Sequence, residues 1–268
     1  MNNSTPPTPT TRVERANVNQ QSNLPFMAMM VAVAGGAAVL GTTLLALDSS
    51  WELTGLLLLA AIGAGLERFS AQLFSQTRVS VSATMMLAAG ALYGVSAAVP
   101  VALAIALACW AFRGKPISRL LFNGGLMVFT GVAATAVYRG LVDALGNAEV
   151  AIVVAAVAAG LTMWAIGSGL VSLMISATSD ERAVTVFREN YLWLFGHFAV
   201  MGSVAIGLSL LYANSGSLVL AAFLAPLALF TVWLRLGAAL SRRAMAEMRA
   251  AKSAAIELSR SSDLKRAS

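Results

Sequence analysis

The sequence predicts an all-α fold, a polytopic bundle of about eight transmembrane helices with a C-terminal cytoplasmic helix. Three observations predict it. Hydrophobic residues make up 58% of the 268-residue chain and charged residues only 11%, whereas a soluble domain carries about 45–50% and about 25%. Long apolar segments recur between residues 26 and 234. Finally, the basic residues gather in the connections that would lie on one side of a membrane.

The N-terminal tail, residues 1–24, consists mainly of Asn, Thr, Pro, Ser and Gln without an apolar period. Such a composition buries too little apolar surface to offset chain entropy, so we expect the tail to be disordered. The apolar run that follows, Phe26–Leu47, lacks a small-x-small cleavage site at its end. It is therefore interpreted as a retained transmembrane helix, the first of a membrane domain over residues 25–236.

Eight apolar segments divide this domain. A membrane span needs about 20 residues at a rise of 1.5 Å. Five segments reach that length, the fourth is borderline, and the second and third are short. Polar and apolar residues do not alternate along them, so the segments predict helices. Their approximate bounds are 26–47, 53–66, 81–94, 95–112, 117–138, 150–177, 191–213 and 217–234.

Charge placement sets the expected orientation. With eight spans and the N-terminus inside, all of the 18 Lys and Arg residues except Arg139 lie on the cytoplasmic side. This asymmetry is the one that orients membrane proteins. We therefore predict a multi-pass protein of the inner membrane with both termini in the cytoplasm.

Two other span counts are consistent with the lengths. A seven-span fold, with residues 85–112 fused into one helix, would export the basic residues of the 113–119 loop, so it is disfavoured. A six-span fold makes the second and third segments re-entrant halves and exports only Arg68 and Arg78. This alternative stays open, because non-helical backbone at membrane depth is tolerated where protein covers it.

Residues 237–268 differ in character from the membrane domain. Residues 237–258 are strong helix formers with several basic side chains. We expect the last span, bent near Pro226, to continue into the cytosol as a basic helical stalk that frays over residues 259–268. The stalk could contact a second copy of the chain or a cytoplasmic signalling partner.

The residue inventory excludes several chemistries. There is one His and one Cys, so this chain alone offers no disulfide, no Cys/His zinc site and no bis-His haem. The lysines lie outside the apolar runs, and no P-loop or Rossmann fingerprint is present. We therefore expect that the chain is not an enzyme and binds no cofactor, metal or nucleic acid. The expected partners are the lipid bilayer and a small-molecule ligand.

Two polar side chains stand inside the predicted spans, and a bare polar group there costs several kcal/mol. Asn123 and His197 both fall near the cytoplasmic side, where they could share one cavity, or each could bond to neighbouring backbone carbonyls. Arg139 lies about a membrane thickness away at the opposite mouth. The candidate ligand-binding residues are Asn123, His197, Arg68, Gln72, Gln76 and Arg139.

Residues 66–79 are the densest polar stretch between the first and last spans. Phe69 and Leu73 are four apart, and Gln72 and Gln76 line an adjacent face, so a short amphipathic helix at the interface is expected. It would be either a segment that faces the ligand or a plain interfacial connector whose arginines reach headgroups.

A resemblance adds to this interpretation. The runs at 66–70 and 76–82, the sequence Leu-Leu-Phe-Asn ending at Asn123, Val-Tyr-Arg ending at Arg139, and Pro226 before a charged helix carry it. Together they resemble the multi-pass N-terminal membrane module of bacterial signalling proteins with HD-GYP or GGDEF output domains. A more distant likeness is to the substrate-binding subunit of energy-coupling-factor transporters. No output domain follows in this sequence, which departs from the signalling pattern.

The resemblance implies two functions of different classes. The first is an integral membrane sensory or anchoring module that couples a ligand or membrane signal to a cytoplasmic helix. The alternative is the substrate-binding subunit of a small-molecule uptake transporter that lacks its own ATPase. The basic stalk favours the first, because a transport subunit needs no long helix beyond its last span.

Overall fold

The computed structural model of the protein describes most of the membrane domain and part of the N-terminal tail. The described residues are 9–47, 51–67, 71–72, 78–79, 81–112, 114, 116–146, 148–179 and 181–216, with 229, 232 and 236. The stalk predicted over residues 237–258 and the bend at Pro226 lie outside the described residues.

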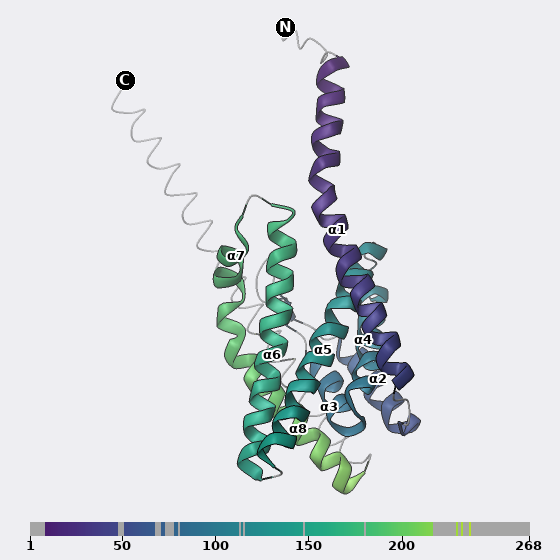
Figure 1. Ribbon diagram of the computed structural model, residues 1–268, viewed down its shortest axis with the longest axis vertical. Helices are drawn as coiled ribbons and strands as arrows, with labels where there is room; N and C mark the ends of the chain where they lie inside the picture. Colours follow the sequence, from purple (N-terminus) through teal and green to yellow (C-terminus); the bar gives the residue numbers. More distant parts are fainter. Residues whose placement is uncertain are drawn as a thin grey trace, which may run out of the picture.

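The described fold is all-α apart from one small hairpin, which confirms the predicted all-α class (Figure 1). Its elements in chain order are α1 (Pro9–Leu47), α2 (Leu53–Glu67), β1 (Ala71–Gln72), β2 (Arg78–Val79), α3 (Ala83–Tyr93), the 3-10 helix η1 (Val95–Ala97), α4 (Ala98–Ala111), α5 (Ile117–Leu145), α6 (Glu149–Ser176), α7 (Ala183–Asn190), the 3-10 helix η2 (Leu192–Leu194) and α8 (Phe195–Ser215).

Four stretches of helix are long and apolar enough to cross a membrane. They are Phe26–Leu47 within α1, Ile117–Leu145, Glu149–Ser176, and Leu192–Ser215 over η2 and α8. By helix length and composition the chain is therefore a multi-pass membrane protein. Helices α2, α3 and α4 are apolar but shorter. Within the described residues the structure therefore has four helices of spanning length, and most of the predicted eighth span, 217–234, lies outside them.

Helix α1 begins at Pro9 and thus includes most of the tail that the composition predicts to be disordered. Proline suits the first position of a helix, because its missing N–H has no intrahelical acceptor there. The rest of the tail then extends a helix that the apolar segment has already nucleated. In Figure 1 this part of α1 projects beyond the bundle, at the end where α7 lies.

Helix α3 is the centre of the bundle. It packs against α2, α4, α5 and α8, and all its residues from 84 to 90 are buried. An apolar helix of this length is typical of a buried core helix rather than a span. Around it, α6 lies between α5 and α8, α4 packs against α2 and α5, and α1 lies at the edge against α5.

Helices α6 and α8 cross at two glycines. A β-carbon on Gly202 would lie 2.9 Å from the Cα atom of Gly160, and one on Gly160 would lie 3.1 Å from that of Gly202. Real β-carbons essentially never show a contact under 3.0 Å, and a contact of 3.1 Å is tighter than nine in ten of theirs. The two backbones therefore touch, which is how small residues allow membrane helices to pack closely.

The connection between α2 and α3 corrects one prediction. The expected amphipathic helix is wrong, because the structure has an antiparallel β-hairpin there, with Ala71 opposite Val79 and Gln72 opposite Arg78. A hairpin ladder supplies backbone partners while it reverses the chain between two antiparallel helices, which a helix along the surface would not do. Residues 73–77 lie outside the described part of the chain.

Candidate functional site

A carboxylate lies buried where the two short helices meet the hairpin. Glu67 is the last residue of α2, and Ser82 directly precedes α3. The Oγ atom of Ser82 donates a hydrogen bond of 2.8 Å to Oε2 of Glu67. Glu67 is 4% exposed and Ser82 1% exposed. An ionisable side chain buried in a membrane bundle is a candidate for a functional site.

The sequence places Glu67 there through the period of α2. Leu59, Gly63 and Glu67 are spaced by four residues, so they share one face of the helix, and all three are buried. Helix α2 packs against α3 and α4. The carboxylate therefore continues the apolar face of α2 into the bundle instead of turning toward the membrane surface.

The hydroxyl of Ser82 bonds to Glu67 rather than capping α3. Ser82 holds the N-cap position of α3, but its side chain makes no capping hydrogen bond, because the hydroxyl donates to Glu67 instead. The N-terminus of a helix carries a partial positive charge, which favours an acidic side chain nearby. The start of α3 therefore helps to hold the buried carboxylate.

The first turn of α3 also borders His197. A void of about 10 Å³ lies between α3, α6 and α8, and its lining includes Thr84, Met163 and His197. This volume holds about one water molecule and no larger ligand. Thr84 itself donates to the carbonyl of Val81. We call Glu67, Ser82, Thr84 and His197 the polar cluster.

The cavity that Asn123 and His197 were expected to share stays a prediction. Asn123 is half-buried on α5, and it does not line the void at His197. Helix α8 packs mainly against α6 and α3 rather than against α5. The void at His197 is therefore shared with Thr84 of α3.

The structure gives less information on the other four predicted site residues. Arg139 is exposed on α5, sixteen residues beyond Asn123, which is about 24 Å along the helix. Gln72 belongs to β1, of which the structure describes the backbone. Arg68 and Gln76 lie outside the described residues.

Glu67 and Ser82 were not among the predicted site residues, although the sequence carries a signal for Glu67. The prediction included Glu67 in the polar stretch of residues 66–79. Its spacing of four residues from Gly63 and eight from Leu59 indicates the buried face of α2. For Ser82 we find no comparable signal, since its partner lies fifteen residues earlier in the chain.

A second polar group lies at the opposite ends of the short helices. The hydroxyl of Tyr93 donates to Oε2 of Glu52 at 3.5 Å, and Nε1 of Trp51 donates to Oγ of Ser96 at 3.0 Å. Glu52 is exposed, in contrast to Glu67. These contacts fix the ends of α2, α3 and η1 to one another. Among the described residues, Glu67 is the buried side chain of a charged type.

Two larger cavities are apolar and lie along α1. One of about 440 Å³ lies between α1, α4 and α5, and one of about 530 Å³ lies between α1, α5 and α6. Neither is lined by a residue of the polar cluster. Within the described ranges no three His, Cys, Asp or Glu side chains come together as a metal site would need.

Comparison with known proteins adds no family. No protein-family model, no curated protein and no solved structure matches the chain. The resemblance to membrane modules of signalling proteins therefore stays a prediction.

Proposed function

We propose that the chain is an integral membrane sensory module, which couples a ligand or membrane signal to a cytoplasmic helix. The observation that carries the proposal is the buried Glu67–Ser82 pair at the start of the central helix α3. A cation or a polar ligand that reached this carboxylate would change the cost of burying it.

The packing offers a path from this pair to the predicted stalk. Helix α3 packs along α8, and its first turn borders His197 of α8. The start of α8 is in turn tied to α6, because Nε1 of Trp164 donates to the carbonyl of Tyr191 at 2.8 Å. A shift of α3 would therefore move α8, the helix that leads into the predicted last span and stalk.

A second candidate function is the substrate-binding subunit of an uptake transporter. The observation in its favour is that two short helices, α2 and α3, meet at a polar tip inside the bundle. Short or interrupted helices that end at a substrate site are typical of secondary transporters. Copurification with an ATPase would favour this function, and copurification with a nucleotide-signalling protein would favour sensing.

Distance measurements between spin labels test the sensory proposal. Ala136 on α5 and Ser203 on α8 are both exposed, so each can be replaced by labelled Cys in a Cys109→Ala background. In nanodiscs, Glu67→Gln, which mimics a neutral carboxyl, should shift the distance distribution between the labels. Glu52→Gln, at the exposed polar group, is the control and should leave the distribution unchanged.

The same distribution in Glu67→Gln and in the parent protein would contradict the proposal. It would show that the charge of the buried carboxylate is not coupled to the position of α8. A shift in both Glu67→Gln and Glu52→Gln would contradict it too, since the response would then not belong to the polar cluster.

A further inference from the structure

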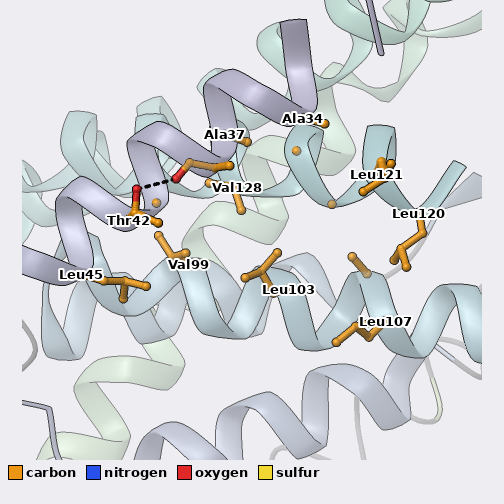
Figure 2. A pocket seen from close by; sticks show the side chains of 15 residues that line it. Ala34, Ala37, Thr42, Leu45, Val99, Leu103, Leu107, Leu120, Leu121 and Val128 are labelled. Atoms are coloured by element: carbon orange, nitrogen blue, oxygen red, sulfur yellow. Dashed lines mark hydrogen bonds between the residues drawn. The ribbon is translucent and has the colours of Figure 1, made fainter. Parts of the chain in front are cut away.

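An apolar slot runs between α1, α4 and α5 (Figure 2). Its volume is about 440 Å³, which is within the range of ligand sites. Small residues open it, among them Ala38 and Gly41 of α1, Ala106 of α4 and Gly124 of α5. Figure 2 shows Leu103 and Leu107 of α4 along its lower wall.

The slot is long and narrow. Its lining extends from Ala34 to Leu45 on α1 and from Leu120 to Val128 on α5, about 16 Å and about 12 Å at 1.5 Å per residue. A volume of 440 Å³ over that length leaves a mean cross-section of about 30 Å². A further helix, 10–12 Å wide, does not fit, whereas one hydrocarbon chain does.

The lining offers almost nothing polar to an occupant. Thr42 is the one lining residue with a polar side chain, and its Oγ1 donates to the carbonyl of Ala38 at 2.8 Å. Figure 2 shows this bond along α1. The occupant of the slot is therefore apolar along its whole length.

One end of the slot is basic. Leu120 and Leu121 line that end, and the exposed Arg119 directly precedes them in the first turn of α5. The segment that precedes α5 carries Arg113 and Lys115 in the sequence. Basic side chains at a membrane surface attract anionic headgroups. The larger groove between α1, α5 and α6 differs, because no lining residue there has a basic residue within two positions.

We propose that the slot is a lipid site, which holds one acyl chain of an anionic phospholipid with its headgroup at Arg119. The chain fills the apolar volume, and the charge complementarity at the mouth selects the headgroup. The slot and the polar cluster share no residue. The lipid site therefore goes beyond the proposed sensory function, and either can fail without the other.

Native mass spectrometry of the delipidated full-length chain tests the site. With phosphatidylglycerol added, the parent protein should bind one lipid more tightly than it binds phosphatidylcholine with the same chains. Gly124→Leu should reduce phosphatidylglycerol binding at least tenfold, because its side chain fills the slot. A β-carbon at Gly124 lies 3.7 Å from that of Ala106, so the substitution starts from an ordinary contact.

Two further variants separate the slot from lipid binding in general. Arg119→Gln should weaken phosphatidylglycerol binding about fivefold, as the loss of one interfacial charge would, and leave phosphatidylcholine binding unchanged. Gly169→Leu fills the neighbouring groove, where a β-carbon meets nothing within 4 Å, and should bind phosphatidylglycerol as the parent does.

Parent-like binding by Gly124→Leu would overturn the proposal, as would equal binding of the two lipids by the parent protein. If Gly124→Leu fails to fold, Ala38→Leu fills the slot from α1, at the edge of the bundle. Parent-like phosphatidylglycerol binding by that folded variant would overturn the proposal equally, and a tenfold loss would support it.

Discussion

Glu67 occupies a position in which its hydroxyl partner matters more than it would at a surface. The carboxylate is almost fully buried, so any hydrogen bond that it loses cannot be replaced by bulk water. An unsatisfied buried acceptor costs about 1–3 kcal/mol, and a charged one more. The bond from Ser82 therefore contributes directly to the free energy of unfolding.

Ser82→Ala should lower the stability of the folded chain by about 1–3 kcal/mol, because it removes a donor from the buried carboxylate. Thermal unfolding in detergent measures this loss. Ser203→Ala is the matched control, since the Ser203 hydroxyl is exposed and donates to the carbonyl of Ala199 in its own helix. Equal melting temperatures for Ser82→Ala and its control would show that the bond carries no such energy.

For single residues, the sequence identifies polar side chains better than it identifies their partners. His197 was singled out because a histidine is rare inside a span, and the structure places it against α3. Its neighbour Thr84 is more than a hundred residues away in the chain. Rarity predicts that a polar group needs a partner, but only the packing of α3 against α8 brings Thr84 to the void at His197.

Helix pairs depend on close approach at a few positions, and α6 with α8 is the clearest example. The crossing at Gly160 and Gly202 leaves no space for a side chain on either helix. Away from the crossing α8 carries Gly207, where a β-carbon would meet nothing within 4 Å. The same substitution should therefore have opposite effects at two sites on one helix.

Gly202→Ala should destabilise the bundle by about 1–3 kcal/mol, because the added methyl group forces α6 and α8 apart. Gly207→Ala should be neutral or stabilising by up to about 1 kcal/mol, since alanine favours the helix. Thermal unfolding of both variants measures the difference. A Gly202→Ala protein as stable as Gly207→Ala would show that the two helices do not touch there.

Element boundaries follow from the sequence wherever an apolar run has clear ends. The first span, Phe26–Leu47, ends with α1 at the same residue, and α5 begins at Ile117 as expected. Helix α5 continues to Leu145, beyond the predicted 138, because polar residues are tolerated where a helix leaves the apolar layer. The hairpin between α2 and α3 was missed, since its ladder joins residues by pairing rather than by period.

The whole molecule has a predicted orientation that labelling can test. In a Cys109→Ala background, Cys at Ser179 should react only with reagents that reach the cytoplasmic side. Cys at Ala144, at the other end of the bundle, should react with impermeant reagents from outside. Both positions are exposed, so accessibility through protein is not limiting. External labelling at position 179 would reverse the topology.

The number of membrane spans cannot be decided from the length of the apolar segments alone. Composition predicts a membrane bundle, and four helices of spanning length bear this out. The short segments were counted as spans because charge placement required an even number of crossings. In the structure the shortest, α3, is buried on all sides by other helices. Whether an apolar helix faces lipid or protein depends on its neighbours, which periodicity does not report.

The length of α2 and α3 has a consequence for how the chain enters the membrane during synthesis. As helices of 15 and 11 residues, they reach about 22 Å and about 16 Å, short of a hydrocarbon core of about 30 Å. Helix α2 also ends in a carboxylate, which partitions poorly from the translocon into lipid. Ser82, which bonds to this carboxylate, is synthesised only after the hairpin. Helix α2 should therefore wait beside the translocon until α3 emerges, and the two should enter the bilayer together.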